Sequence, residues 1–122
     1  MPLESGSYRS GVKMSDFICD NCGKKVFPLD GIVSWNKENK TFTNFKLTHK
    51  NKPGVENGCQ PEDNNRYREL YTLTLANGYL DFILYLIQNW ENGYSLEGES
   101  LRKLIAQLNL HIHEKLLLMI ED

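Results

Sequence analysis

The residues best suited to chemistry are three cysteines and a histidine in the first half of the chain. Cys19 and Cys22 form a Cys-x-x-Cys turn that is followed directly by Gly23. Two thiolates at this spacing can grip one ion, and the glycine lets the backbone curl beneath the sulfurs. We therefore predict a zinc site with four ligands, which are Cys19, Cys22, His49 and Cys59.

Alternation along the segment 41–49 gives independent support for His49. Phe45, Leu47 and His49 share one face of an extended strand, whereas the residues between them are polar. A lone histidine on such a face is more often packed and hydrogen-bonded in a core, but three cysteines in the same half of the chain favour a metal ligand. Free thiols without a metal remain the alternative.

Short β-strands are expected on both sides of the cysteine turn, at 17–18 and 26–27, where aromatic and aliphatic residues flank it. Further along, 31–35 and 41–47 are rich in β-forming residues, and the polar linker 36–40 between them has the length of a hairpin loop. The sequence therefore predicts a β-hairpin. An isolated hairpin is marginally stable in water, so a zinc ion at its base would stabilise it.

The segment after the last cysteine carries the pattern of a helix start. Pro61 is followed by two acidic residues, and acids after a proline are typical of a helix N-terminus. Over about residues 17–68, the order of cysteine turn, hairpin and last ligand before a helix resembles the treble-clef group of small zinc folds. The second Cys-x-x-Cys pair that is usual in that group is replaced here by His49 and Cys59 at wider spacing.

The last part of the chain has helical periodicity. Residues 79–90 are apolar almost all round, which is typical of a helix that is covered on several sides. Residues 101–108 carry leucine and isoleucine at i, i+3, i+4 and i+7, and a similar stripe follows over 112–120, with a bend expected at Asn109-Leu110. These stripes favour packing over a cofactor pocket.

The stretch 66–78 admits two interpretations. Residues 66–71 have the spacing of a short helix, whereas 71–75 alternate like a strand. Asn77-Gly78 is expected to break the chain after them. Both interpretations remain open at this point.

Length and composition favour one compact unit. The chain has 122 residues, of which 25% are charged and 40% hydrophobic, and these values are ordinary for a globular protein. We predict an α+β fold in which an N-terminal zinc knuckle with a β-hairpin is followed by a small bundle of about three helices. The expected divisions are a flexible tail at 1–14, a zinc-binding module at 15–62 and a helical unit packed on it at 63–122.

The cysteine count and the lengths of the apolar segments bear on the compartment. Three cysteines would leave one over in a disulfide framework, which favours a reducing cytoplasm. No apolar run near the start is long enough for a secretory signal, and the run 79–87 is far short of the roughly 20 residues that a membrane span needs. We therefore expect a cytoplasmic protein with no membrane partner.

Positive charge gathers around the predicted hairpin. The window 24–52 holds seven lysines against two acids and is interleaved with aromatic residues. Lysines neutralise phosphates and exposed aromatic rings stack on unpaired bases, so the window indicates single-stranded nucleic acid. Balancing a negative zinc–thiolate cluster would also explain the lysines, and the window contains no arginine for base recognition. The candidate contact residues are Trp35, Phe42, Phe45, Lys46 and Lys50.

No motif for a particular reaction accompanies the predicted ligands. A shell of three cysteines and one histidine is closed, whereas catalytic zinc keeps one position open for water. His111 and His113 diverge on a helix and cannot both bind one ion there, so we expect them at a surface or an interface. We therefore predict a non-enzymatic module that binds another protein, with single-stranded nucleic acid as the alternative and a zinc–thiolate redox switch as a minor one.

Overall fold

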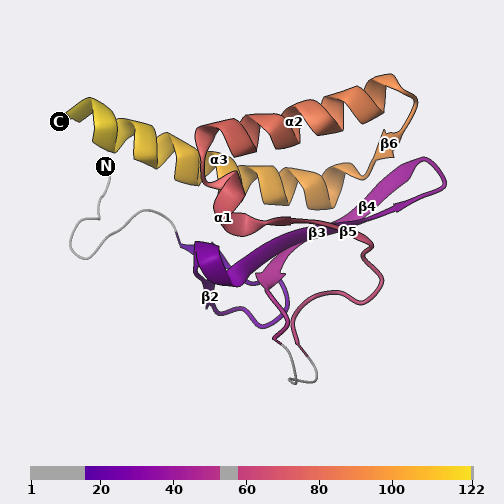
Figure 1. Ribbon diagram of the computed structural model, residues 1–122, viewed down its shortest axis with the longest axis horizontal. Helices are drawn as coiled ribbons and strands as arrows, with labels where there is room; N and C mark the ends of the chain where they lie inside the picture. Colours follow the sequence, from indigo (N-terminus) through magenta and orange to yellow (C-terminus); the bar gives the residue numbers. More distant parts are fainter. Residues whose placement is uncertain (1–15, 53–57, 122) are drawn as a thin grey trace.

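Two long helices, α2 (Ala76–Glu91) and α3 (Gly98–Glu121), cover one face of a four-stranded sheet (Figure 1). The sheet has the order β5-β3-β4-β6, in which β6 runs parallel to β4 and the other pairs are antiparallel. Its strands are β3 (Gly31–Glu38), β4 (Thr41–His49), β5 (Arg66–Glu69) and β6 (Ser95–Leu96). The computed structural model describes the backbone of 16–52 and 58–121 and the side chains of those residues up to His111, so the predicted tail at 1–14 lies outside the described residues.

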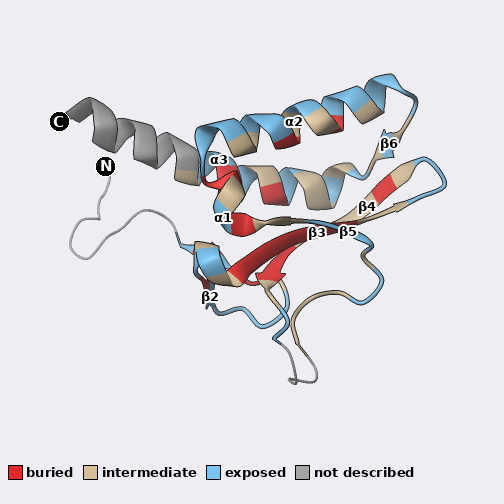
Figure 2. Cartoon of the chain, viewed as in Figure 1, coloured by how far each residue is buried: buried red, intermediate tan, exposed pale blue. Residues whose placement is uncertain are grey.

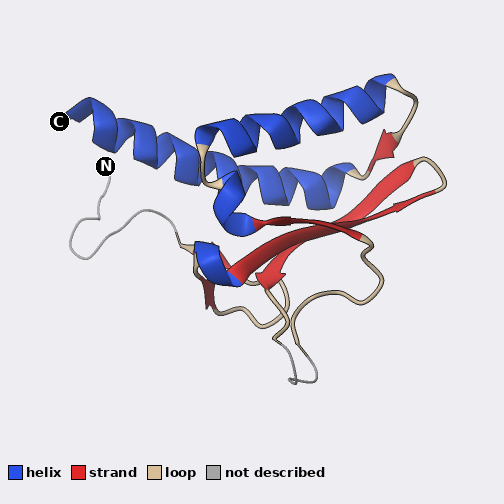
Figure 3. Ribbon diagram, viewed as in Figure 1, coloured by secondary structure: helices blue, strands red, loops and turns tan. Residues whose placement is uncertain are grey.

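The smaller elements lie around the cysteine turn and at the end of the sheet. Strands β1 (Phe17–Ile18) and β2 (Lys25–Val26) pair on either side of the turn, as the sequence predicts. A 3-10 helix, η2 (Pro28–Asp30), leads into β3, and a short helix, α1 (Leu70–Leu73), follows β5. Figure 3 shows how these elements join the long helices in a mixed α+β structure, which confirms the predicted fold class.

Strands β3 and β4 form the predicted β-hairpin. Its loop is shorter than expected, because only Asn39 and Lys40 lie between the two strands. Both residues have positive φ, 52° and 58°, which is the backbone of a type I′ turn and matches the twist of the strands. The two strands pair from Glu38 opposite Thr41, beside the turn, to Gly31 opposite His49, with one irregularity between Ser34 and Asn36.

A bulge in β4 turns Phe42 and Phe45 toward the same face of the sheet. Strict alternation would place residues three apart on opposite faces. The register of the hairpin shifts between Ser34 and Asn36, and Asn44 in the facing part of β4 has a φ of 57°. Both phenylalanines are consequently buried, with 0% and 2% of their surface exposed.

Glu97, just before α3, and Ser100, in its first turn, hold this bulge from the outer edge of β4. The Glu97 carboxylate accepts the N–H of Asn44 at 2.7 Å, and the Ser100 hydroxyl accepts the N–H of Phe45 at 3.0 Å. These bonds satisfy two amides that the bulge leaves without a strand partner. The Asn44 amide, followed by the Ser100 hydroxyl, lowers the pKa of the Glu97 carboxyl.

The prediction that Trp35, Phe42 and Phe45 contact a partner is wrong, because all three side chains are buried. The helices cover the face of the sheet that carries them. The Trp35 ring lies 5.5 Å from that of Phe82 on α2, and the Phe42 ring stacks on Tyr85 at 5.9 Å. The hairpin therefore belongs to a larger core, whereas the prediction treated it as a two-stranded element with little core of its own.

No helix begins at Pro61, so this part of the sequence prediction is wrong. The chain makes a turn there instead. Beyond the turn, the side-chain amide of Asn64 donates to the Ser34 hydroxyl at 2.9 Å and to the carbonyl of Asn44 at 3.0 Å. These bonds hold the segment against the hairpin, where it continues as β5 beside β3.

The stretch that the sequence left open contains both a strand and a helix. Residues 66–69 form β5 and 70–73 form α1, whereas Asn77-Gly78 lies in the first turn of α2 and does not break the chain. Gly78 is needed for packing, because a Cβ atom there would collide with the carbonyl oxygen of Thr72. The glycine thus permits the close approach of α1 to α2.

Helix α3 runs without interruption through Asn109-Leu110, so the predicted bend is wrong. Both residues are exposed, and an asparagine in a helix costs no more than about 0.7 kcal/mol relative to alanine. That cost is too small to end a helix whose other face packs on the sheet.

No helix within the described ranges is long and apolar enough to cross a membrane.

The described residues cover helix α2 on one side only. Phe82 and Leu86 are buried on the side that faces the sheet, whereas the outward side is exposed (Figure 2). The prediction of a helix covered on several sides is therefore wrong, because α2 forms the outer layer. Four large exposed side chains make up what we call the α2 apolar face: Leu80, Leu84, Ile87 and Trp90.

Matched substitutions on the two sides of α2 test this arrangement. Leu86 is 4% exposed, and Leu86→Ala should lower the free energy of unfolding by about 2–5 kcal/mol because it leaves a cavity. Leu84 is 52% exposed, and Leu84→Ala should change the free energy of unfolding by no more than about 0.5 kcal/mol. Urea unfolding followed by circular dichroism measures both changes. Similar losses in the two variants would contradict the one-sided burial.

Candidate metal centre

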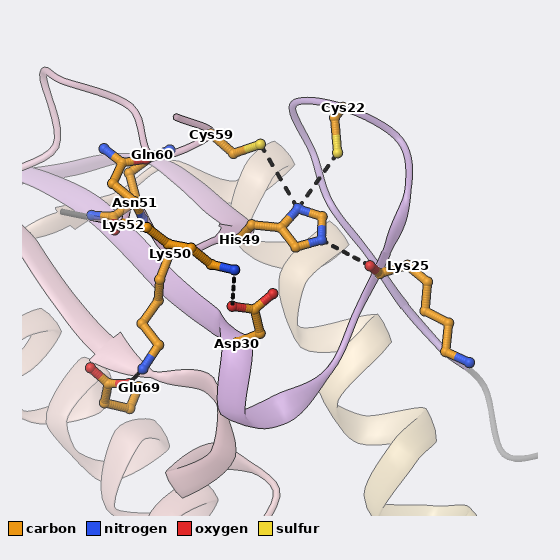
Figure 4. Close-up of polar contacts among 10 residues, drawn as sticks. All are labelled: Cys22, Lys25, Asp30, His49, Lys50, Asn51, Lys52, Cys59, Gln60 and Glu69. Atoms are coloured by element: carbon orange, nitrogen blue, oxygen red, sulfur yellow. Dashed lines mark hydrogen bonds and ion pairs between the residues drawn. The ribbon is translucent and has the colours of Figure 1, made fainter. Parts of the chain in front are cut away.

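The four predicted ligands converge on one point. The sulfur atoms of the three cysteines and a ring nitrogen of His49 all lie within 4.8 Å of one another. His49 Nδ1 is 3.5 Å from Cys22 Sγ and 3.8 Å from Cys59 Sγ (Figure 4). A tetrahedral ion with bonds of about 2.3 Å to sulfur and about 2.0 Å to nitrogen requires the sulfur-to-nitrogen distances to be about 3.5 Å. Cys19, Cys22, His49 and Cys59 can therefore hold one metal ion.

The knuckle, residues 19–23, is shaped by hydrogen bonds to Cys19. The N–H groups of Asn21 and Cys22 each donate to Cys19 Sγ at 3.4 Å, and the N–H of Gly23 donates to the carbonyl of Cys19 at 3.0 Å. Gly23 has a φ of 76°, which a residue with a side chain rarely adopts. The glycine after the second cysteine therefore has the conformation that the sequence pattern requires.

His49 is oriented by the backbone of β2. Its Nε2 donates to the carbonyl of Lys25 at 2.9 Å, on the side of the ring away from the thiols (Figure 4). With the proton on Nε2, the Nδ1 atom has a free lone pair that faces Cys22 and Cys59. The hydrogen bond thus selects the tautomer that a metal ligand needs.

The pKa of the Cys19 thiol is lower than that of an ordinary cysteine. Burial raises its pKa, but the backbone N–H groups of Cys22, His49 and Asn21 stabilise the thiolate more strongly and bring the pKa to about 6. The thiolate, which is the form that binds metal, therefore predominates at neutral pH. For Cys59 the Asn21 amide lowers the pKa, but burial and the neighbouring Cys19 thiolate outweigh it and the pKa is raised.

Asp20, inside the knuckle, fastens it to β4 and α3. The N–H of Leu47 donates to Asp20 Oδ2 at 2.7 Å, and the N–H of Asp20 donates to the carbonyl of Leu47 at 2.8 Å. Asp20 Oδ1 also lies 3.3 Å from the ammonium of Lys103. The knuckle thus takes the place of a neighbouring strand at this point of the outer edge of β4. Nothing in the sequence around Asp20 identifies these partners, so its role was not predictable.

The segment that carries Cys59 is tied to the chain that follows His49. The N–H of Asn51 donates to Gln60 Oε1 at 2.6 Å, and the N–H of Gln60 donates to Asn51 Oδ1 at 3.1 Å. Asn51 lies two residues after one ligand and Gln60 directly after the other. The reciprocal pair therefore positions Cys59 beside His49.

The two lysines predicted to bind nucleic acid lie in different surroundings. Lys50 Nζ forms an ion pair with Glu69 at 2.7 Å, and nearby Lys52 lies 4.0 Å from Asp30 (Figure 4). Lys46 forms no ion pair with any residue that the structure describes, but it lies near the start of α3, where its charge adds to the Asn44 amide and the Ser100 hydroxyl in lowering the pKa of the Glu97 carboxyl. Acids of the fold therefore neutralise part of the positive charge in this window.

His111 lies apart from the metal cluster. Its ring packs against that of Phe17 at 4.9 Å, and the side chain is half-buried. The side chain of His113 lies outside those that the structure describes. The expected surface or interface position of the two histidines therefore stays a prediction.

The chain matches no known family model, no curated protein and no solved structure. Its knuckle, hairpin and last cysteine have the order of a treble clef, but a strand follows where that fold places its helix. The function therefore has to be inferred from the chain's own residues.

The same substitution at two histidines tests the ligand set. His49→Gln should weaken metal binding by more than about 100-fold, because it removes the one nitrogen donor of the cluster. His111→Gln should leave the affinity unchanged, because His111 does not belong to the cluster. Competition with a chromophoric chelator measures both affinities. Metal binding that survives His49→Gln, or that is lost equally in both variants, would contradict the assignment.

Proposed function

We propose that the protein is a non-enzymatic module in which a zinc ion stabilises a fold that binds another protein. The zinc proposal is supported by one observation: the sulfur atoms of three cysteines and a ring nitrogen of His49 lie within 4.8 Å of one another. Zinc suits this donor set, since it accepts thiolates and imidazole nitrogens in a tetrahedral arrangement. Mg²⁺ and Ca²⁺ prefer oxygen ligands instead. The free thiols also favour a reducing compartment such as the cytoplasm.

The composition of the cluster supports a structural role for the ion. Four protein donors complete a tetrahedral shell, whereas catalytic zinc keeps one position for water or substrate. The donors come from three separate segments, which are the knuckle, the end of β4 and the loop before β5. An ion held by all three would add its binding free energy to the stability of the fold.

Native mass spectrometry of protein purified without chelator should find one zinc ion per chain. Chelation should then lower the free energy of unfolding, by about 4 kcal/mol relative to protein in a buffer whose free zinc is about 1,000 times the dissociation constant. Thermal unfolding with and without zinc measures the difference. A folded protein without metal, with three titratable thiols and the same melting temperature in both buffers, would contradict the zinc proposal.

The α2 apolar face is the surface that we assign to the partner. It runs along a helix of 16 residues, about 24 Å in length, and its side chains follow one another at helical spacing. The exposed acids Asp81 and Glu91 lie beside it. A partner helix with an apolar side flanked by Lys or Arg would match both the shape and the charge of this face.

The nucleic-acid alternative lacks a supporting observation in the fold. The aromatic rings that would stack on bases, those of Trp35, Phe42 and Phe45, lie in the core. Lys50 is already paired with Glu69. Binding to a protein through α2 is therefore the better supported of the two functions.

Two variants place the same charge on the α2 apolar face and beside it. Leu84→Asp should weaken binding of the partner at least about tenfold, because a carboxylate would be buried in an apolar contact. Gln88→Asp, on the same helix but outside the apolar face, should change the affinity less than about twofold. The partner is captured with zinc-loaded wild-type protein, identified, purified and titrated by calorimetry against all three proteins.

Equal affinities of the two variants would contradict the assignment of the α2 apolar face. The α2 apolar face could instead bind a second copy of this protein. Sedimentation of the protein alone tests this, because it measures the oligomeric state. A concentration-dependent dimer that Leu84→Asp abolishes and Gln88→Asp preserves would make the face a contact between copies, and would overturn the proposal of a different partner.

A further inference from the structure

The three cysteines of the metal cluster differ in how far their side chains are exposed. Cys22 is exposed, Cys59 is half-buried, and Cys19 has only 2% of its surface exposed (Figure 4). A dissolved oxidant reacts with a sulfur atom that it can reach, and the thiolate is the form of cysteine that it attacks. A bound metal ion keeps its cysteine ligands in that form. Cys22 is therefore the ligand that an oxidant reaches most easily.

Cys19 is placed to react with an oxidised Cys22. The two residues lie on one tight turn, in which the N–H of Gly23 donates to the carbonyl of Cys19 at 3.0 Å. The N–H of Cys22 lies 3.4 Å from Cys19 Sγ, and the two sulfur atoms are within 4.8 Å of each other. Rotation of side chains within one turn can bring such sulfur atoms to bonding distance. Cys19 can therefore close a disulfide with Cys22.

Cys59 is a less suitable partner for Cys22, because it reaches the cluster from a separate segment. That segment is tied to the chain after His49 by the reciprocal hydrogen bonds of Asn51 and Gln60. A disulfide between Cys22 and Cys59 would have to draw two segments together, and strain of this kind makes a disulfide less stable. The pair Cys19 and Cys22 needs no movement between segments. It is therefore the favoured pair.

The knuckle has anchors that do not involve the thiols. Asp20 exchanges hydrogen bonds of 2.7 Å and 2.8 Å with the backbone of Leu47 and lies 3.3 Å from the ammonium of Lys103. The N–H of Ile18 donates to Gln107 Oε1 on α3 at 3.2 Å. These contacts remain when the sulfur atoms change their bonding. The knuckle therefore stays in place, so that the cluster can form again after reduction.

We propose that Cys22 is an oxidation site, at which hydrogen peroxide converts the ligands Cys22 and Cys19 into a disulfide and so empties the metal centre. The proposal rests on the zinc proposal, because it concerns the thiolates that would hold that ion. After oxidation, His49 and Cys59 are the donors that remain. Two donors are too few for a structural zinc site, which takes four. Oxidation would thus regulate whether the protein carries its metal.

The reaction takes two steps. The Cys22 thiolate first attacks one oxygen of hydrogen peroxide, the O–O bond breaks, and the other oxygen leaves as hydroxide. The Cys19 thiolate then attacks the sulfur of the resulting sulfenic acid, the S–S bond forms, and a second hydroxide leaves. The two sulfur atoms are oxidised by one electron pair in total, and the peroxide is reduced by the same pair. A thiol reductant reverses the disulfide by exchange.

The experiment uses the full chain, whose zinc content is first verified by native mass spectrometry. Hydrogen peroxide should release the zinc, which a chromophoric chelator measures, and the chain should then have the mass of a protein with one disulfide. Alkylation and peptide mapping should find Cys19 joined to Cys22 and the alkyl group on Cys59. A thiol reductant added with zinc should restore one zinc ion per chain. Zinc that stays bound in peroxide, a disulfide that contains Cys59, or failure to take up zinc after reduction would each overturn the proposal.

The same substitution at two ligands separates Cys22 from Cys59. Cys22→His and Cys59→His each leave two thiols and two imidazoles, a donor set that zinc also accepts. Both positions have room for the larger ring, because Cys22 is exposed and Cys59 borders a polar pocket of about 240 Å³ that Lys46 and Thr48 also line. Peroxide should release zinc from Cys59→His within about twofold of the wild-type rate, and from Cys22→His at least about tenfold more slowly.

Equal rates of release from the two variants would overturn the assignment of Cys22. Where a variant carries no zinc, the disulfide mapped in the wild-type chain decides. Wild-type protein that carries zinc and keeps it in peroxide overturns the oxidation site and leaves the metal proposal intact. Wild-type protein without zinc overturns the metal proposal and the oxidation site with it, so the two failures are distinguishable.

Discussion

Three thiols and one imidazole held within 4.8 Å impose the main electrostatic constraint on this fold. Two thiolates about 4 Å apart repel each other by about 4 kcal/mol at an effective dielectric constant of about 20. Either protons or a cation must offset this repulsion if the three segments are to stay together. The backbone amides that stabilise the Cys19 thiolate favour the cation, since they make the deprotonated form available at neutral pH.

The two faces of the sheet are closed by different interactions. The face toward α2 and α3 carries Trp35, Phe42 and Leu47 and is closed by apolar packing. The other face carries polar residues such as Ser34, Lys46 and Thr48. The knuckle and the segment 58–65 are held beside it by hydrogen bonds, and they meet the end of β4 at the four residues that can hold a metal ion. This division explains how a polar pocket can lie on one face while the core of the protein lies on the other.

Parts of the structure that form through interactions between residues close in the sequence could be predicted, whereas parts that depend on contacts between distant segments could not. The ligand set could be found because the chain has only three cysteines and three histidines, and their metal chemistry narrows the choice. The hairpin could be found because β-forming runs around a polar linker are a local signal. Strand β6 could not, because it depends on the distant contact between the N–H of Ser95 and the carbonyl of Lys40. The same holds for β5, which Asn64 directs toward the hairpin.

Residue types and short patterns thus suffice to identify the knuckle, the four residues that can hold a metal ion, the hairpin and the segments that become the two long helices. Which side chains remain free to bind other molecules depends on how distant segments pack. Periodicity shows that α2 is apolar on more than one side, but only contact with the sheet buries Phe82 and leaves Leu84 exposed. The pocket at Thr48 likewise exists only where the knuckle, β4 and the segment around Cys59 meet. Burial and concavity arise from several segments at once, so no local pattern encodes them.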